Sequence, residues 1–447
     1  MMVESTQQPR ALGVAVIGMG NVGSQVVRML QVHGDELRQR IGAPLELRGV
    51  AVRNPHHDRG IGPELVTTDA QSLIARPDID LVVEVMGGIE PARELIAMAL
   101  TAGKSVVTAN KALLADYTSE LAQLADRHGA DLCFEAAVAG AIPVVRPLIQ
   151  SLSGDRINRV VGIVNGTTNY LLSAMSERSD RYEDLLAAAQ ELGYAEADPT
   201  ADVEGHDAAA KAAILASLAF HTRVTTAQVY RQGMTRLTAE DFAAAAAEDC
   251  TIKMLAVCER VDAGPGEPAI ADGGKERIAV RVYPALIPRK HPLAAVGGAF
   301  NAVVVEADNA GRLMFYGQGA GGAPTASAVM GDLVMAARNK VHGGRAPGES
   351  VYAELPVAPI GDIVTRHHLR LTVSDRAGAL AAVAGEFARR GVSIASVRQQ
   401  LDGPHAQLVV LTHHARESVL DQIATSLAAL DSVTSVTSVL RLEGTEE

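Results

Sequence analysis

Tryptophan is absent from this chain of 447 residues, and aromatic side chains make up only 3% of it. Proteins that bind single-stranded nucleic acid stack the bases on aromatic side chains, so this composition disfavours that class of function. The formal net charge of −12 also leaves little scope for the basic face that a phosphate backbone attracts. We therefore expect no nucleic-acid partner.

Cysteine is scarce, and long apolar segments are missing. The three cysteines, Cys133, Cys250 and Cys258, form no CxxC pair, and an odd count fits reduced thiols better than a disulfide framework. No apolar run approaches the ~18 residues that a membrane-spanning helix needs. The first ten residues are polar and lack the pattern of a secretory signal peptide. These absences predict a soluble, cytoplasmic protein with no membrane partner.

The first part of the chain alternates short apolar runs with helical patterns, and its length leaves room for two or three domains. The runs 12–17, 45–52, 81–85 and 105–108 are typical of buried strands, and segments 22–30 and 92–102 have helical spacing. This alternation predicts an α/β fold in which helices cover both faces of a parallel sheet.

The pattern changes near Leu132. Long helical segments precede several β-rich runs: 182–192 and 206–220, then 278–286, 302–306 and 313–316. This mixture predicts a central α+β domain with a mixed sheet. The glycine- and proline-rich stretch 343–348 indicates a boundary. Beyond it, residues 367–442 predict the element order βαββαβ, which is the ferredoxin-like pattern.

The first apolar run ends in a glycine-rich turn with the sequence Gly18, Met19, Gly20, Asn21, Val22, Gly23. In a dinucleotide-binding turn, the first glycine permits the tight bend and the second lets the backbone approach the pyrophosphate. The third lets helix and strand pack closely, and the phosphates meet the free N–H groups of the helix start. A purely structural turn is the alternative, but the position at the start of a βαβ pattern favours a nucleotide site.

The end of the second apolar run bears on the choice of cofactor. NAD enzymes usually place an acidic residue there to bind the ribose 2′-hydroxyl. This run ends in Val52, Arg53 and Asn54, and Arg53 would suit a 2′-phosphate. We therefore expect NADP rather than NAD, although NAD and a merely solvated arginine remain alternatives.

An acid-rich segment, residues 193–211, leads into an alanine-rich helical pattern. Asp207 and Lys211 are four residues apart, so they share one helix face. A surface ion pair worth about 0.2–0.5 kcal/mol is one interpretation. The other is a lysine held by a carboxylate that transfers the proton of an alcohol or carbonyl, a role that typically contributes ~10²–10⁴ in rate. The spacing alone does not choose between them.

The same segment, GYAEADPTADVEGHDAAAK, closely resembles the signature of homoserine dehydrogenases of the monofunctional type. Further matches lie along both the cofactor and substrate regions: VMGG (85–88), TANK (108–111), FEAAVAGAIPVV (134–145), VNGTTNYLL (164–172), YGQGAGG (316–322) and PTASAV (324–329). The resemblance implies reversible NADP-dependent reduction of L-aspartate 4-semialdehyde to L-homoserine, in threonine, methionine and isoleucine biosynthesis.

The resemblance also implies roles for individual residues. Lys211 would donate or accept the proton, Asp207 would bind the substrate ammonium group and position the lysine, and Glu196 would bind substrate. Thr167 and the Gly166 amide would hold the substrate carboxylate, with a structural turn as the alternative. Around the cofactor, the resemblance places four further residues: Thr108, Lys111, Gly193 and Gly319. Lys111 would lie between cofactor and substrate, unless it only caps a strand loop.

A monovalent-cation site is implied by the resemblance alone. Glu135 and the carbonyls of Val138, Gly140 and Ile142 would surround a sodium ion, since hard cations take oxygen ligands and carbonyls supply them whatever the side chain. Nothing in the sequence has the histidine and cysteine spacing of a zinc site.

The turn Asp375–Leu380 resembles the D-x-x-G-x-L turn of ACT domains, which bind small amino acids at a helix start. Asp375, Gly378 and Leu380 would contact the effector, expected to be threonine, unless the domain serves only assembly. A homodimer or homotetramer is expected. The implied division is a Rossmann domain at 1–134 completed by about 317–345, a substrate-binding domain at 135–316, a linker at 346–366 and an ACT domain at 367–442.

Two other functions remain as alternatives. One is a Rossmann dehydrogenase for a different amino acid or polyol, and the other is a catalytically silent amino-acid sensor. The combination of Glu196, Asp207 and Lys211 argues against the first, because these residues suit an amino-acid alcohol. An intact Asp207 and Lys211 argue against the second.

Overall fold

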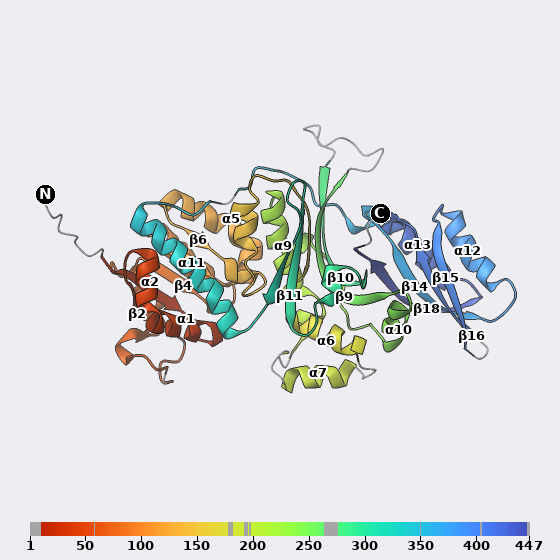
Figure 1. The fold of residues 1–447 in the computed structure, drawn as a ribbon, viewed down its shortest axis with the longest axis horizontal. Helices are drawn as coiled ribbons and strands as arrows, with labels where there is room; N and C mark the ends of the chain where they lie inside the picture. Colours follow the sequence, from red (N-terminus) through yellow and green to blue (C-terminus); the bar gives the residue numbers. More distant parts are fainter. Residues whose placement is uncertain are drawn as a thin grey trace. The chain divides into compact units, whose positions relative to one another are not determined.

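The computed structural model describes residues 10–57, 59–177, 182–191, 195, 198–262, 276–348, 350–402 and 405–444 (Figure 1). The chain divides into two compact units. Unit 1 comprises Met1–Ile157, Ala213–Thr226 and Asn301–Glu354, and unit 2 comprises Asn158–Ala212, Ala227–Phe300 and Leu355–Glu447. Each unit therefore combines segments that lie far apart in the sequence.

Unit 1 contains a six-stranded parallel sheet with the order β3-β2-β1-β4-β5-β6. The strands are β1 (Leu12–Ile17), β2 (Leu45–Ala51), β3 (Val66–Thr67), β4 (Leu81–Glu84), β5 (Ser105–Thr108) and β6 (Leu132–Cys133). Helices lie on both sides: α1 (Asn21–Val32), α2 (Gly34–Ile41), α3 (Ala70–Ala75), α4 (Ala92–Thr101), α5 (Lys111–His128) and α11 (Gly322–His342). A hairpin of β11 (Phe300–Ala307) and β12 (Gly311–Gln318) precedes α11.

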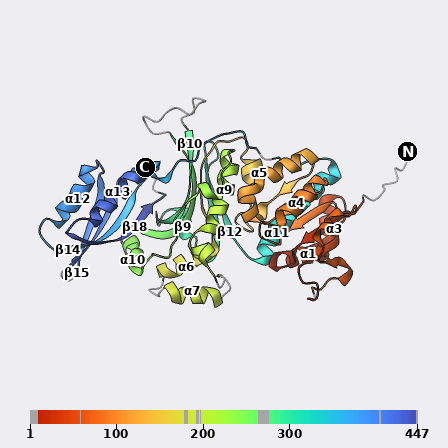
Figure 2. The ribbon, with the colours of Figure 1, turned by 180° about the vertical axis from the view of Figure 1, so that it is seen from behind.

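The alternation of side chains along β1 explains why both faces are covered. Val14 and Val16 pack into a core with α1, α2 and α11, whereas Ala15 and Ile17 pack into a second core with α3, α4 and α5. Successive residues of a strand point to opposite faces, so a strand that is apolar throughout requires a layer on each side. The predicted parallel sheet is confirmed, and Figure 2 shows the same layers from behind.

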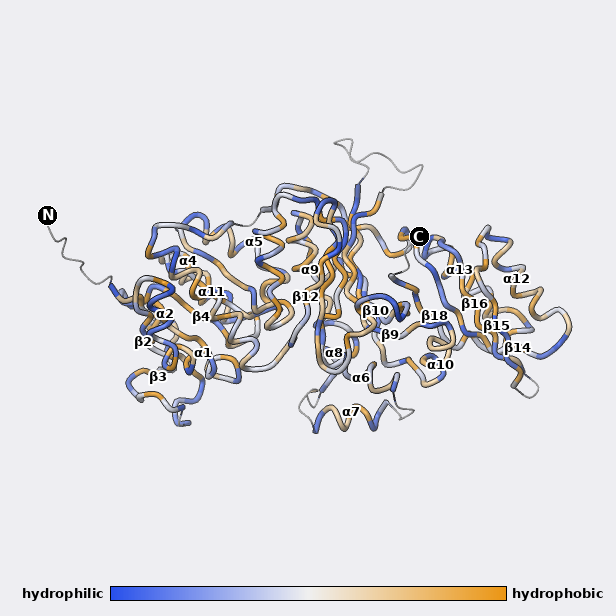
Figure 3. Tube along the Cα trace, viewed as in Figure 1, coloured by the Kyte–Doolittle hydropathy of each residue, from blue (hydrophilic) through white to orange (hydrophobic). Residues whose placement is uncertain are grey.

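Unit 2 contains a mixed sheet with the order β7-β9-β10-β18-β14-β16-β15. Its strands are β7 (Ile157–Ile163), β9 (Cys250–Asp262), β10 (Glu276–Pro288), β18 (Val433–Leu442), β14 (His367–Ser374), β16 (His405–Thr412) and β15 (Ile394–Asp402), and β8 (Tyr230–Arg231) pairs with β10. The helices are α6 (Gly166–Glu177), α7 (Tyr182–Glu191), α8 (Thr200–Val203) and α10 (Ala239–Ala247), while α9 (His206–Phe220) begins in unit 2 and ends in unit 1. Apolar residues concentrate along the strands (Figure 3).

The C-terminal part of unit 2 has the predicted order βαββαβ, with α12 (Ala379–Arg389) and α13 (Glu417–Ala428) as its helices. Leu369, Leu371 and Val373 of β14 face these helices in a common core. The last strand, β18, lies between β14 and β10. It pairs antiparallel with β14 and parallel with the end of β10, where Leu286 lies opposite Leu442. This module is therefore continuous with the central sheet.

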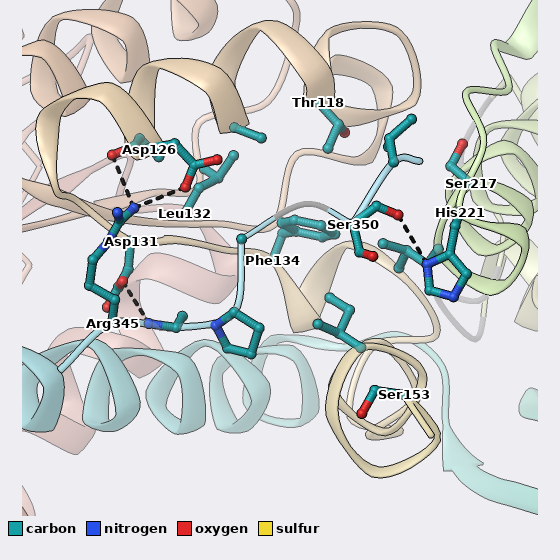
Figure 4. A pocket seen from close by; sticks show the side chains of 18 of the residues that line it. Thr118, Asp126, Asp131, Leu132, Phe134, Ser153, Ser217, His221, Arg345 and Ser350 are labelled. Carbon is teal, nitrogen blue, oxygen red and sulfur yellow. Dashed lines mark hydrogen bonds and ion pairs between the residues drawn. The ribbon is translucent and has the colours of Figure 1, made fainter. Parts of the chain in front are cut away.

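The start of the segment that the sequence predicts as a linker, 346–366, belongs to unit 1. The Arg345 guanidinium donates to Asp126, and the backbone N–H of Ala346 donates to Asp131. Further along, the His221 ring forms a hydrogen bond with the Ser350 carbonyl oxygen. The same ring stacks on Tyr352, with the ring centroids 4.7 Å apart. These residues line part of a cavity of about 150 Å³ (Figure 4). Among the described helices, none is long and apolar enough to span a bilayer.

Candidate active site

The glycine-rich turn between β1 and α1 has the geometry that a dinucleotide needs. Gly18 has a φ of +100°, and a Cβ on Gly23 would lie 2.1 Å from the Gly18 carbonyl oxygen. Nothing lies within 4 Å of a Cβ built on Gly20, so this face of the turn is open. No side chain caps the start of α1. The free N–H groups at this helix start therefore suit an anion such as a phosphate.

A cleft of about 810 Å³ adjoins this turn in unit 1. Its walls come from the ends of β1, β2 and β4, as expected for a ligand at the carboxyl edge of a parallel sheet. They include Gly18, Met19, Gly20, Arg53, Asn54, Arg59, Met86, Gly87, Gly88 and Glu90. The Arg59 guanidinium donates to the carbonyls of Asn54 and His57, which folds it over the loop after β2. Sequence reasoning named Arg53 but missed Arg59, although both are basic residues just after β2.

Thr108 supports the turn after β4. Its hydroxyl donates to a Glu84 carboxylate oxygen at 2.5 Å, and Glu84 also accepts the N–H groups of Met86 and Gly87. Burial raises the pKa of Glu84, while these hydrogen bonds oppose the rise. Thr108 thus shapes the cleft through Glu84, which sequence reasoning missed. Lys111 is the exposed first residue of α5.

Asp207 and Lys211 form a buried pair on α9, with exposed fractions of 8% and 7%. Lys211 Nζ donates to Asp207 Oδ2 at 2.7 Å and to the Val164 carbonyl at 2.6 Å. Asp207 lies in the first turn of its helix, where the dipole favours negative charge. Because the pair is buried, the interpretation as a surface ion pair is wrong.

Asn165 completes this cluster, and sequence reasoning missed it as a site residue. Its side-chain Nδ2 donates to Asp207 Oδ2 at 2.8 Å and to Asp202 Oδ1 at 2.7 Å. Its Oδ1 accepts the N–H of Thr168, which caps the start of α6. One amide therefore fixes both the carboxylate beside the lysine and the helix that begins at Gly166. The only signal was its place in the VNGTTNYLL match.

Gly166 and Thr167 are the first two residues of α6, and both are half-buried. A Cβ on Gly166 would lie 2.8 Å from the Ala299 carbonyl oxygen, so the loop 296–300 lies against this helix start. The N–H groups of a helix start suit a carboxylate. Gly193 and Glu196, which the sequence analysis also singles out, lie outside the described residues.

The loop 135–146 is organised around the Glu135 carboxylate. Its oxygens accept the backbone N–H groups of Val144, Val145 and Arg146 at 2.6–2.9 Å and the Arg146 side chain at 2.8 Å. Ala139 and Gly140 have φ angles of 57° and 58°, which turn the backbone sharply. Among the hydrogen bonds of the described residues, none ends on the carbonyl oxygens of Val138, Gly140 or Ile142.

Gly319 lies beside this loop. A Cβ on Gly140 would lie 2.4 Å from the Gly319 carbonyl oxygen, and a Cβ on Gly319 would lie 1.9 Å from the fully buried Asn301 amide. The Ala141 N–H donates to the Gln318 carbonyl at 3.1 Å. Two glycines thus permit the close approach of the end of β12 to the loop.

In the C-terminal module, Asp375 and Gly378 occupy the turn between β14 and α12. Gly378 is the N-cap of α12 with a φ of +90°, and no side chain caps the helix. Leu380 is 44% exposed. The Ala379 N–H donates to the Arg376 carbonyl within the turn, so the N–H groups that follow it at the helix start lie next to an exposed apolar side chain.

Three family models match this chain. They are described as homoserine dehydrogenase (residues 143–334), homoserine dehydrogenase NAD-binding domain (18–135) and ACT domain (367–432). A homoserine dehydrogenase of Mycobacterium tuberculosis is 60% identical over 442 residues, which cover 98% of each chain. Together these matches extend over all three predicted regions of the chain.

Solved structures agree in fold. A homoserine dehydrogenase from Thiobacillus denitrificans is 37% identical, covers 97% of this chain and 98% of its own, and has a TM-score of 0.90. A hyperthermophilic archaeal homoserine dehydrogenase in complex with NADPH is 26% identical, covers 76% of this chain and 100% of its own, and has a TM-score of 0.61.

Proposed function

The chain belongs to the homoserine dehydrogenase family of NAD(P)-dependent oxidoreductases, and on that premise we propose that it interconverts L-aspartate 4-semialdehyde and L-homoserine with NADP. The observation that carries this proposal is the buried arrangement of Lys211, Asp207 and Asn165. The bound nicotinamide supplies or accepts the hydride. The residues of the chain must therefore bind the amino acid and move one proton.

We assign the proton transfer to Lys211. In the reductive direction its ammonium group donates a proton to the aldehyde oxygen, which becomes the hydroxyl of homoserine, and in the oxidative direction the amine accepts that proton. Asp207 holds Nζ at 2.7 Å, and Asn165 orients Asp207. Positioned proton transfer of this kind contributes ~10²–10⁴ in rate. Asp207 and Glu196 are also proposed to bind the substrate ammonium group, and the amides of Gly166 and Thr167 its carboxylate. Lys111 is proposed to lie between cofactor and substrate.

The preference for NADP rests on Arg53, supported by Arg59 in the same cleft. The NADPH complex of the archaeal relative agrees with this choice. We expect Arg53→Glu to raise the KM for NADP⁺ by ~10–100-fold while sparing NAD⁺, because one or two charge-assisted hydrogen bonds to the 2′-phosphate are lost. Initial rates with each cofactor test this. Arg40→Glu makes the same change of charge at an exposed residue of α2 and serves as the control. Equal effects on both cofactors would refute the assignment.

A monovalent cation, sodium by family analogy, is proposed for the loop 135–146. The carbonyls of Val138, Gly140 and Ile142 are the donor set that such an ion prefers. Glu135 belongs to this set by the same analogy; its carboxylate already accepts four N–H groups, and its carbonyl accepts the Val138 N–H. The ion would fix the loop and take no part in proton transfer.

The turn of Asp375, Gly378 and Leu380 is proposed to bind an amino-acid effector, threonine by family analogy. The protein is proposed to be a cytoplasmic homodimer or homotetramer. Its reaction is proposed to serve threonine, methionine and isoleucine biosynthesis. A Rossmann domain at 1–134 completed by 317–345 is supported by the packing of α11 with α1 and β1 in one core. A substrate-binding domain at 135–316, a linker at 346–366 and an ACT domain at 367–442 complete the proposed division.

The full chain should oxidise L-homoserine with NADP⁺, measured as the appearance of reduced cofactor by absorbance. L-Serine and glycerol, which lack either the chain length or the amino-acid group, should give less than ~1% of that rate. A folded chain that is inactive with homoserine and active with another alcohol would favour a different dehydrogenase. A folded chain that binds cofactor but oxidises none of them would favour an amino-acid sensor.

A further inference from the structure

Lys253 is a buried lysine that the proposed mechanism does not use. It lies on β9 and is 3% exposed. Its Nζ donates to the Val296 carbonyl at 2.6 Å, to Asn169 Oδ1 at 3.1 Å and to Ser173 Oγ at 3.4 Å. All three partners are neutral oxygens, and no ion pair joins Lys253 to a carboxylate among the described residues.

Burying a cation without a counter-ion is unfavourable. Burial lowers the pKa of Lys253 to about 8, and the charge of Glu177 only partly opposes the shift. A methionine or leucine at this position would avoid that penalty. Lys253 therefore lowers the free energy of unfolding. Its contribution to the protein must lie in the residues that its three hydrogen bonds hold in place.

The hydrogen bonds of Lys253 hold the loop 296–300 and the side chain of Asn169. Asn169 is fully buried on α6, and its Nδ2 donates to the carbonyls of Val296, Gly298 and Phe300 at 2.9–3.2 Å. Lys253 orients this amide by bonding its Oδ1 and shares the Val296 carbonyl with it. The loop contains two glycines, one of them with a φ of +59°, so its backbone would be poorly ordered without these bonds.

The same loop lies against the start of α6. The Ala299 carbonyl oxygen is so close to Gly166 that a Cβ there would lie 2.8 Å from it. Asn169 is three residues beyond Gly166 on the same helix, so the anchor and the helix start form one rigid piece. The position of the loop thus determines the space over the N–H groups of Gly166 and Thr167.

We propose that Lys253 and Asn169 are positioning residues that hold the loop 296–300 over the start of α6 and thereby set the affinity for the carboxylate end of the amino-acid substrate. This inference rests on the proposed role of Gly166 and Thr167. Neither residue touches the reacting atoms, so the effect falls on substrate binding rather than on proton transfer.

The test is Lys253→Met in the full chain. We expect the KM for L-homoserine to rise by ~10-fold or more, with kcat within ~3-fold and the KM for NADP⁺ unchanged, as for loss of an interaction made equally in ground and transition states. The melting temperature should stay the same or rise, because an uncompensated buried charge is removed. Lys253→Gln, which can still donate to the Val296 carbonyl, should recover part of the affinity and covers the case in which the methionine variant fails to fold.

Lys104→Met is the matched control. Lys104 is 8% exposed, and among the described residues its Nζ bonds only the carbonyls of Ile74 and Arg76, both at 2.5 Å, within unit 1. The Lys104→Met variant should leave the KM for homoserine unchanged. Asn169→Ala should raise that KM, and the double variant with Lys253→Met should raise it by less than the product of the single effects, because both act through one loop.

Three results would overturn the inference: an unchanged KM for homoserine in Lys253→Met, a fall in melting temperature with equal losses for both substrates, or the same rise in Lys104→Met. If the wild-type chain does not turn over homoserine, the proposed function itself is refuted. Failure of the inference and failure of the proposed function are therefore distinguishable.

Discussion

Replacing Lys211 by alanine should lower kcat for homoserine oxidation by ~10²–10⁴, the usual contribution of a positioned proton-transfer group. The KM for NADP⁺ should change by less than ~2-fold, because the cofactor cleft is lined by other residues. Asp207 would lose a partner at 2.7 Å but keep the Asn165 amide at 2.8 Å. Steady-state rates with saturating cofactor measure the effect.

Two further measurements separate loss of the proton carrier from loss of structure. Small primary amines added to Lys211→Ala should restore part of the rate, because the truncated side chain leaves a buried space beside Asp207. Lys104→Met, which also removes a buried lysine, should keep the wild-type kcat. Retention of more than a tenth of kcat in Lys211→Ala would show that another group or water carries the proton.

Replacing Glu443 by alanine should destabilise unit 2 by ~3–5 kcal/mol, the usual effect of removing one partner of a buried ion pair. Glu443 Oε1 accepts from Arg281 at 3.1 Å and from the Tyr283 hydroxyl at 2.5 Å, and Oε2 accepts from Arg159. Glu259 bonds the same two arginines. The variant would leave two largely buried guanidinium groups sharing one carboxylate. A fall of roughly 10 °C in the melting transition is expected for a unit of this size.

The destabilisation caused by Glu443→Ala should depend on pH. Burial opposes ionisation of Glu443, but Arg281 and Arg159 more than offset it and lower its pKa to about 2, well below the usual range of a glutamate. A carboxylate with a depressed folded pKa stabilises fully above its unfolded pKa, and that stability is lost as pH falls toward the folded value. The difference between wild type and Glu443→Ala should therefore shrink below about pH 4. Glu36→Ala, which breaks an exposed pair with Arg40, should cost at most ~1 kcal/mol. A similarly small effect in Glu443→Ala would contradict the prediction.

The sequence predicts those features of this protein that depend on local pattern. Apolar runs such as 12–17 identify parallel strands because both faces of each strand are buried. The spacing of Asp207 and Lys211 places them on one helix face, and the structure shows them bonded. The glycine turn is local in the same sense, since the contact between Gly18 and Gly23 involves one strand end and one helix start.

Features that depend on long-range proximity escape sequence reasoning. Asn165 is 42 residues from Asp207, and Lys253 is 84 residues from Asn169. An asparagine or a lysine alone carries no period or motif that specifies such a partner. Glycines and prolines predict a linker at 346–366, yet the Ala346 N–H and the Arg345 side chain just before it bond acidic residues more than two hundred positions earlier.

Because Leu286 pairs in parallel with Leu442, removal of the C-terminal module would also disrupt the central sheet. A chain shortened after residue 366 would lose β14 and β18 together, and the end of β10 would become an edge strand with unpaired backbone groups. Such edges recruit other chains and cause aggregation. The shortened protein would also leave Arg281 without Glu443. Poor solubility of a truncated enzyme would then reflect an open sheet edge, and its altered activity would not by itself measure the loss of regulation.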